Sequence, residues 1–262
     1  MSYSTIRYEV QNHVARITLN RPDAGNAMDA QMGRDLMHAA IQASEDRAVR
    51  AVIITGAGRM FCAGGDLKLF ASHGDGLAAH LKELAGSLHL AISRFVRMNA
   101  PVIAAVNGAA GGGGMSFVLA ADLVLAAESA KFTMAYTRAG LSPDGGSTFF
   151  LPRIVGARRA LELALTNRVL SAHEAHEWGL VTKVLADAAL QAEAQALAEQ
   201  LASGATRAFG AAKRLLHHSF SESLETQMEL EAQGIAEQAR GADAREGIAA
   251  FVAKRAPKFG AS

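Results

Sequence analysis

The chain has 262 residues, half of them hydrophobic, and carries 26 basic and 25 acidic side chains. This balance argues against nucleic acid as an electrostatic partner, and no run approaches the roughly 18 apolar residues of a membrane span. A single cysteine, Cys62, and an N-terminus without a signal-peptide pattern lead us to expect a cytoplasmic protein that binds no membrane.

The first part of the sequence alternates between strand and helix patterns. Apolar residues alternate over 6–19, which predicts two strands joined by a turn. Continuous apolar runs over 51–55 and 101–106 predict buried strands. The further expected elements are helices over 28–41, 77–98 and 115–120 and a strand over 122–126. Strands that alternate with helices at this spacing predict βαβ units and a mainly parallel sheet.

Beyond about residue 156 the pattern changes to helices with almost no strands. Alanine-rich segments with apolar faces are expected to form helices over 187–201, 205–218, 224–240 and 242–254. No linker rich in Pro, Gly or Ser separates the two parts. We therefore predict one core over 1–200 and a C-terminal helical region over 201–262 that packs on the core or on a neighbouring subunit.

Two glycine-rich segments follow the two buried strands. NGAAGGGG over 107–114 comes directly after the strand at 101–106. FCAGGDLK over 61–68 follows the strand at 51–55 after one short loop. Glycine lets a ligand approach main-chain N–H groups, and a helix N-terminus favours negative charge, although either segment alone is also typical of a tight strand–helix joint. Because parallel strands end at the same edge of a sheet, one N–H from each loop could converge on a single carbonyl oxygen.

These motifs and two later ones carry a specific resemblance. LSPDGG over 141–146 and LPRIVGARRALEL over 151–163 complete a set that resembles the enoyl-CoA hydratase/isomerase (crotonase) superfamily along essentially the whole chain. The resemblance implies an α/β fold, a crotonase (ClpP-like) spiral of ββα units with a C-terminal helical trimerisation region. It also implies an acyl-CoA thioester as substrate and a homotrimer, or a hexamer made of two trimers. Coenzyme A enters as part of the substrate, and no permanently bound cofactor is expected.

The resemblance also assigns catalytic roles. The main-chain N–H groups of Gly65 and Gly113 are expected to form an oxyanion hole for the thioester oxygen. Where hydratases of the family carry two glutamates, this chain has Ser116 and Tyr136. A carboxylate appears instead at Asp144, where isomerase members place their catalytic aspartate, although Pro-Asp-Gly is by itself a strong turn signal. We therefore predict an isomerase in which Asp144 moves a proton between carbons.

The C-terminal segment over 224–259 looks most like the ring-1,2-epoxyphenylacetyl-CoA isomerases of aerobic phenylacetate degradation. Those enzymes open an epoxide to a seven-membered oxepin and isomerise 3-enoyl-CoA to 2-enoyl-CoA. Both reactions need an oxyanion hole and one proton-handling carboxylate, which this sequence offers. The expected substrate is therefore an enoyl-CoA or an arylacetyl-CoA thioester.

Three alternatives stay open at this point. An enoyl-CoA hydratase would need a carboxylate beyond Asp144. His89 falls where the family's 4-chlorobenzoyl-CoA dehalogenases carry a water-activating histidine, so Asp144 as nucleophile with His89 would give dehalogenation or thioester hydrolysis. A lone histidine on a helix is otherwise typical of a packed or surface residue. A catalytically silent CoA- or RNA-binding member is the non-enzyme alternative, although the sequence has no clustered basic segment.

Contacts with coenzyme A and with the acyl group follow from the same resemblance. The expected CoA contacts are Asn26, Ala27, Met28, Ala63, Gly65, Asp66, Leu67 and Lys68, with Phe251 and Lys254 reaching in from a neighbouring subunit. Gly112, Ser116 and Tyr136 are expected to line the acyl pocket. The nine histidines show no metal-ligand spacing, so no metal site is predicted.

Overall fold

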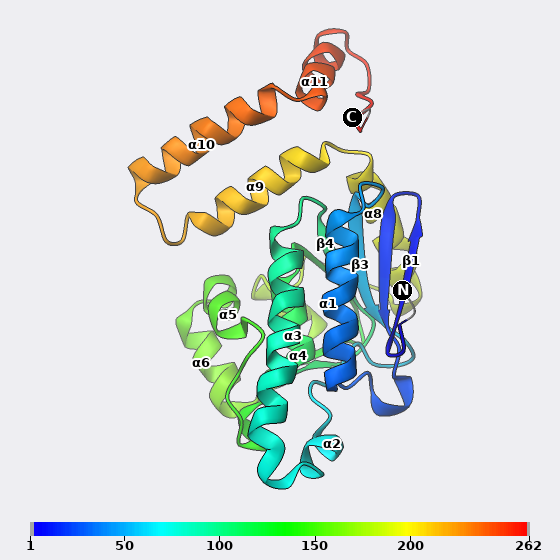
Figure 1. The fold of residues 1–262 in the computed structure, drawn as a ribbon, viewed down its shortest axis with the longest axis vertical. Coiled ribbons are helices and arrows are strands. Elements are labelled where there is room, and N and C mark those ends of the chain that lie inside the picture. Colours follow the sequence, from blue (N-terminus) through cyan, green and yellow to red (C-terminus); the bar gives the residue numbers. More distant parts are fainter. Residues whose placement is uncertain (1–2, 261–262) are drawn as a thin grey trace.

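A six-stranded sheet forms the centre of the fold in a computed structural model that describes residues 3–260 (Figure 1). Its order is β1-β2-β3-β4-β6-β9, in which β1 and β2 are antiparallel and every other neighbouring pair is parallel. The strands are β1 (Ile6–Gln11), β2 (Val14–Leu19), β3 (Ala51–Gly56), β4 (Val102–Val106), β6 (Leu123–Ala127) and β9 (Lys183–Leu185). The predicted hairpin and mainly parallel sheet are both confirmed.

Helices cover both faces of this sheet, which explains why its central strands are apolar. Every residue of β3 and β4 is buried, as expected for parallel strands with helices on each side. In Figure 1, α1 (Ala30–Glu45) and α3 (Leu77–Arg97) lie side by side in front of the sheet, and α8 (Leu190–Ala202) lies behind it. The first of these helices begins after Asp29, whose carboxylate caps it by accepting the Met32 N–H at 2.8 Å.

Shorter elements complete the core. A three-stranded sheet of β5 (Ala110–Gly111), β7 (Lys131–Thr133) and β8 (Leu170–Ser171) lies next to the buried helix α4 (Gly113–Ala120). The remaining helices are α2 (Leu67–Ala71), α5 (Ser147–Val155), α6 (Ala157–Thr166), α7 (Ala172–Glu177) and 3₁₀ turns at Pro22–Ala24, Gly74–Gly76, Thr137–Ala139 and Asp187–Ala189. Strands β8 and β9 lie in the part of the chain where almost no strands were expected, because strands of two or three residues are too short to show an apolar period.

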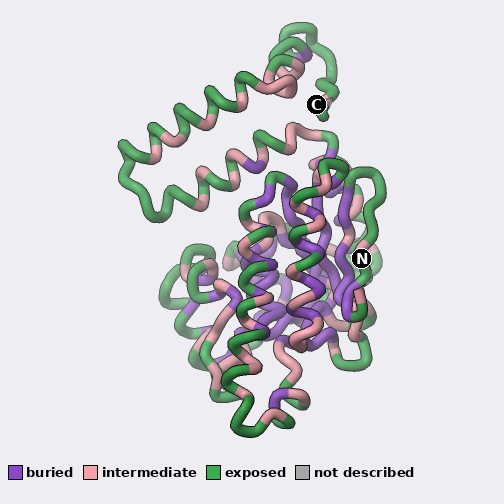
Figure 2. The backbone as a smooth tube through the Cα atoms, viewed as in Figure 1, coloured by how far each residue is buried: buried purple, intermediate pink, exposed green. Residues whose placement is uncertain are grey.

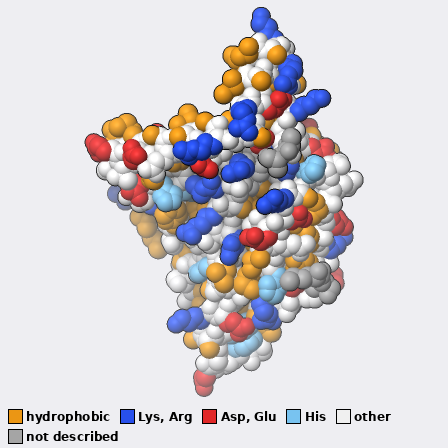
Figure 3. Space-filling model, turned by 45° about the horizontal axis from the view of Figure 1, so that its top comes forward, with side chains coloured by type: hydrophobic (Ala, Val, Ile, Leu, Met, Phe, Trp, Pro, Cys, Tyr) orange, Lys and Arg blue, Asp and Glu red, His pale blue; other side chains and the backbone are white. Residues whose placement is uncertain are grey.

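The chain ends in three helices that extend away from the core. Helices α9 (Thr206–His218), α10 (Leu224–Ala239) and α11 (Ala242–Val252) form the yellow-to-red arm of Figure 1, and Figure 2 shows most of it exposed. Exposed apolar side chains run along this arm (Figure 3), namely Leu216, Phe220, Leu224, Met228, Ile235, Ile248, Phe251 and Val252. So much apolar surface is typical of an interaction surface. In the part of the chain that the structure describes, no helix combines the length and apolar character needed to cross a bilayer.

Candidate active site

The two glycine-rich loops meet at the carboxyl edge of the main sheet. They are joined by an isolated parallel bridge, in which Cys62 donates its N–H to Ala109 O at 3.1 Å and accepts the Gly111 N–H at 2.9 Å. The approach is so close that a Cβ on Gly64 would lie 3.0 Å from Gly111 O. Glycine is also required there by a φ of +103°. The predicted convergence of the loops is therefore confirmed.

The N–H groups of Gly65 and Gly113 are available to a ligand. Because Gly113 is the first residue of α4, its N–H has no partner inside the helix. Within residues 3–260, neither N–H donates a hydrogen bond to another backbone group. Both residues line a cavity of about 300 Å³ where the loops converge. The cavity thus has two free donors for an oxygen atom, and the dipole of α4 adds positive potential.

Apolar side chains form most of the cavity wall. They are Met28, Ala63, Leu67, Phe70, Leu81, Leu84, Ala85, Leu88, Ala135, Ala139 and Leu141. Four of them come from α3 and share one face of it, because helical residues three or four apart are neighbours. The ionisable side chains in the wall are Lys82, Tyr136 and Asp144. Among the described residues, Asp144 is therefore the one carboxylate that the cavity offers for acid–base chemistry.

Asp144 lies in a loop that is held by hydrogen bonds to its main-chain carbonyl oxygen. Its carbonyl oxygen accepts hydrogen bonds from the Ser147 N–H at 3.1 Å and the Ser147 Oγ at 2.8 Å. Ser116 Oγ donates to the same oxygen at 3.0 Å. Gly145 and Gly146 follow with φ of +61° and +74°, and a Cβ on Gly145 would lie 2.7 Å from Ser116 Cβ. Pro-Asp-Gly therefore forms a turn, as the sequence indicated, and this turn also brings Asp144 to the cavity wall, so the two interpretations of Asp144 are compatible.

Tyr136 holds one oxygen of the Asp144 carboxylate. Its hydroxyl donates to Asp144 Oδ1 at 2.7 Å and lies 2.8 Å from Ser116 Oγ. Burial, and then the Asp144 charge, raise the pKa of Tyr136, so the phenol stays protonated and remains a donor. Within the described residues, Asp144 Oδ2 accepts no hydrogen bond. Gly112 and Tyr136 line the cavity as expected, whereas Ser116 is fully buried and supports Tyr136.

His89 lies outside this cavity. It lines a separate groove of about 860 Å³ between α3, α5 and α9, whose walls include Phe149, Phe150 and His217. Its Nε2 accepts the Gly145 N–H at 3.0 Å. The structure therefore places His89 against the loop that carries Asp144. His89 is not among the described residues that line the cavity containing the Gly65 and Gly113 N–H groups.

Comparison with known proteins identifies the family. Residues 9–262 match the enoyl-CoA hydratase/isomerase family. The chain belongs to this family. It is 44% identical, over 99% of both chains, to a probable enoyl-CoA hydratase from Rhodobacter capsulatus. It is 41% identical to the 1,2-epoxyphenylacetyl-CoA isomerase of Escherichia coli, over 95% of this chain and 96% of that protein.

The solved structures agree with the family. An enoyl-CoA hydratase from Polaromonas matches with a TM-score of 0.93 at 34% identity, over 97% of this chain and 99% of that one. The predicted crotonase fold is confirmed, with its mixed α/β core and C-terminal helical region. The chain is thus an acyl-CoA-processing enzyme of the enoyl-CoA hydratase/isomerase family.

In this family member, the segment over 26–28 is buried and supports the cavity from within. Asn26 has no exposed surface, and its side chain donates to Ala57 O at 2.9 Å and Met60 O at 2.8 Å. Ala27 is also buried, and Met28 places its side chain in the cavity wall. These three expected CoA contacts therefore lie inside the protein, where they connect the loops that form the site.

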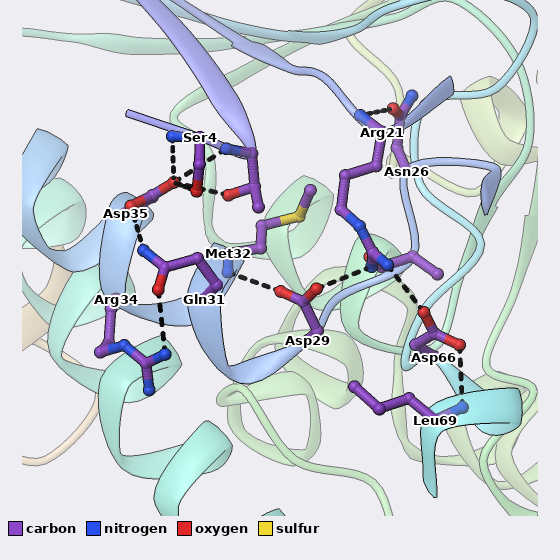
Figure 4. Close-up of polar contacts among 12 residues, drawn as sticks. Ser4, Arg21, Asn26, Asp29, Gln31, Met32, Arg34, Asp35, Asp66 and Leu69 are labelled. Carbon is purple, nitrogen blue, oxygen red and sulfur yellow. Dashed lines mark hydrogen bonds and ion pairs between the residues drawn. The ribbon is translucent and has the colours of Figure 1, made fainter. Parts of the chain in front are cut away.

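Asp66 is likewise engaged within the protein. The Arg21 guanidinium pairs with Asp66 at 2.9 Å and with Asp29 at 3.2 Å, which joins the caps of α2 and α1 (Figure 4). Burial opposes ionisation of Asp66, but hydrogen bonds from the Leu69 N–H and from Arg21 outweigh it and lower the pKa of this carboxyl. The pair fixes the loop that carries the Gly65 donor. Sequence reasoning missed Arg21, because no spacing marks an ion pair between residues so distant in the chain.

The other expected CoA contacts lie at open positions. Ala63 and Leu67 are exposed at the cavity, and Lys68 is exposed on α2. Phe251, which is 85% exposed, belongs to α11, and Lys254 follows that helix. Figure 1 shows α11 at the opposite end of the fold from α2. The structure does not bring these two residues to the cavity of their own chain.

Replacing Asn26 with alanine is expected to lower the free energy of unfolding by about 2–4 kcal/mol, because two buried carbonyls lose their donor. Alanine would also occupy a positive φ of 55°. Chemical denaturation measures the change. Asn12→Ala is the matched control, since Asn12 has a similar φ of 51° but an exposed side chain. Equal losses in the two variants would show that the buried hydrogen bonds are not the cause.

Proposed function

We propose that this enzyme is an isomerase that moves a proton on an enoyl-CoA thioester, or opens the epoxide of an arylacetyl-CoA thioester. Asp144 acts as the acid and base, and the N–H groups of Gly65 and Gly113 hold the thioester oxygen. The observation that carries the proposal is the composition of the cavity wall, in which Asp144 is the one carboxylate among the described residues. The similarity to the Escherichia coli isomerase supports the same assignment.

Isomerisation of a 3-enoyl-CoA would need one base and one charge-stabilising site. Asp144 Oδ2 removes a proton from the carbon next to the thioester, and the electron pair moves onto the thioester oxygen. Two N–H donors stabilise the resulting enolate, each by about 3 kcal/mol. The electron pair then returns through the conjugated system, and Asp144 delivers the same proton to the far carbon of the double bond. Substrate and product have the same atoms, and no water is consumed.

Hydration of a 2-enoyl-CoA is the second candidate, because the Rhodobacter capsulatus relative is named a probable enoyl-CoA hydratase. That reaction adds a water molecule, so it needs a group to activate water and a group to protonate carbon. The positions of the two hydratase glutamates are occupied by Ser116 and Tyr136, whose hydroxyls both donate to Asp144, Ser116 to its main-chain carbonyl and Tyr136 to its carboxylate. Asp144 alone would have to serve both purposes, which favours isomerisation.

Hydrolysis through Asp144 and His89 is less well supported. In that mechanism the histidine must present a free nitrogen to a water molecule near the reacting carbon. His89 Nε2 already accepts the Gly145 N–H, and the ring lines the other groove. Asp144 beside two free N–H donors also argues against a catalytically silent CoA- or RNA-binding protein.

A turnover panel tests the proposed function. Purified enzyme is given 3-hexenoyl-CoA, crotonyl-CoA and the epoxide of phenylacetyl-CoA, and products are separated by chromatography. Formation of 2-hexenoyl-CoA or of an oxepin supports the isomerase. Formation of 3-hydroxybutyryl-CoA as the main product would establish a hydratase instead. An acyl- or aryl-enzyme ester on Asp144 would establish the nucleophilic mechanism.

A homotrimer, or a hexamer of two trimers, is the assembly that we expect for the active enzyme. The exposed apolar side chains of the α9–α11 arm support a subunit interface. Neither Phe251 nor Lys254 is among the described residues that line the cavity of their own chain, which supports their contact with CoA bound to a neighbour. Sedimentation equilibrium measures the assembly.

Replacing Tyr136 with phenylalanine is expected to lower kcat for isomerisation about tenfold. The Asp144 carboxylate would lose the hydrogen bond from the Tyr136 hydroxyl, and a hydrogen bond to a charged group contributes about 1.5–3 kcal/mol. The rate with 3-hexenoyl-CoA measures the loss. Ser116→Ala is the comparison: it keeps the bond between Tyr136 and the Asp144 carboxylate but removes one of the three bonds to the Asp144 carbonyl, so it should cost less than Tyr136→Phe does. A Tyr136→Phe enzyme as active as the wild type would show that this hydroxyl does not support Asp144.

A further inference from the structure

The peptide group between Asp144 and Gly145 is held at both of its polar atoms. Its carbonyl oxygen accepts three hydrogen bonds, two from Ser147 and one from Ser116. Its N–H donates to His89 Nε2 at 3.0 Å. The carbonyl bonds come from α4 and α5, whereas the N–H bond reaches across to α3. Rotation of this peptide would move the Asp144 side chain, so these contacts together fix where its carboxylate lies.

The bond to His89 is the one contact that ties this N–H to another element among the described residues. Gly145 is buried, and within the described residues its N–H has no other acceptor. Gly145 and Gly146 both have positive φ, and glycine is the residue with the most conformational freedom to lose. Without the contact to α3, this peptide would be held through its carbonyl oxygen alone, and its N–H would lose its protein partner next to two flexible glycines.

We infer that His89 is a positioning residue, which sets the Asp144 carboxylate by accepting the Gly145 N–H, and not the base that activates water. The inference rests on the proposed role of Asp144. It requires a neutral imidazole, because an imidazolium has no lone pair with which to accept a hydrogen bond. The side chain needed at position 89 is therefore an acceptor of suitable length rather than a proton carrier.

This requirement makes the loop sensitive to the protonation of one ring. The charged and titratable groups around His89 in the groove are Arg97 from α3 and Arg214, His217 and His218 from α9, with Asp144 in the adjoining loop. In acid, protonation of His89 would release the Gly145 N–H and lower the rate.

Two variants of the same position test the inference. His89→Gln supplies an acceptor oxygen near the place of Nε2 and does not titrate, whereas His89→Leu fills similar space without an acceptor. We expect His89→Leu to lower kcat about tenfold, the loss that corresponds to one hydrogen bond, with KM changed less than about twofold. His89→Gln should keep more than about a third of the wild-type kcat and lose less activity in acid than the wild type does.

Other outcomes overturn the inference. If His89→Gln is as impaired as His89→Leu, the imidazole acts as a base or proton carrier. If both variants match the wild type in kcat and pH profile, His89 has no part in the reaction.

Hydrogen exchange of the peptide over 141–148, followed by mass spectrometry, separates this inference from the proposed function. We expect faster exchange in His89→Leu than in the wild type and in His89→Gln, whatever the substrate. If the wild type shows no isomerase turnover but this order of exchange holds, the proposed function fails and His89 still holds the loop. If turnover is found and exchange is equal in all three proteins, the positioning role alone fails.

Discussion

Replacing Asp144 with asparagine is expected to lower kcat for isomerisation of 3-hexenoyl-CoA by roughly 10³–10⁴, the upper part of the range for general acid–base groups. The amide cannot take up and return a proton. It has the size of the carboxyl group, and its oxygen can still accept the Tyr136 hydroxyl that now bonds Asp144 Oδ1. The cavity and the N–H donors of Gly65 and Gly113 stay in place, so binding of an acyl-CoA should persist.

Two measurements on Asp144→Asn separate chemistry from binding. The rate comes from the absorbance of the conjugated 2-enoyl thioester, and calorimetry with a saturated acyl-CoA gives the affinity. Asp75→Asn, at an exposed aspartate in the turn before α3, is the control for a changed charge and should react at the wild-type rate. Turnover by Asp144→Asn above about a tenth of the wild-type rate would remove Asp144 from the mechanism.

The parts of this enzyme that are local in sequence could be predicted. Continuous apolar runs marked β3 and β4, and the glycines after each strand marked the loops that form the cavity edge. Parallel strands end together, so the meeting of the two glycine-rich loops followed from the parallel sheet, whereas the choice of Gly65 and Gly113 within them came from the resemblance to the family. The two short strands β8 and β9 escaped prediction, because they contain too few residues to show a period.

The contacts that fix the site could not be predicted, because they join segments distant in the chain. Arg21 pairs with Asp66, and His89 with Gly145, through tertiary packing that no spacing records. The burial of Asn26 has the same origin: a polar residue in a turn gives no sign that its amide will bond two carbonyls of another loop. Sequence motifs therefore located the groups that we propose to react, whereas the residues that hold them in place came from the structure.

The main-chain N–H of Gly113 can be removed by a single substitution, and we expect its loss to lower kcat strongly. Gly113 is the first residue of α4, a position where proline fits because its N–H would not be used by the helix. Gly113→Pro deletes the N–H, and Gly113→Ala keeps it. Both add a Cβ, which would lie 3.0 Å from the flexible Met28 Sδ. Gly65 is less suitable, since a Cβ there would lie 2.5 Å from the Phe70 ring.

We expect Gly113→Pro to have a kcat about 10²–10³ below that of Gly113→Ala, the usual cost of one oxyanion donor. The comparison with alanine cancels the effect of the added Cβ, so the ratio reports the replacement of the N–H by the carbon atoms of the proline ring. Thermal unfolding within a few degrees of each other would show that the two variants fold alike. Equal rates in two such folded variants would mean that the thioester oxygen is held elsewhere. A large ratio of kcat between Gly113→Ala and Gly113→Pro, together with loss of activity in Asp144→Asn, would mean that both groups act on the same thioester. The Gly113 N–H would then stabilise the thioester oxygen, and the Asp144 carboxylate would remove the proton from the adjacent carbon.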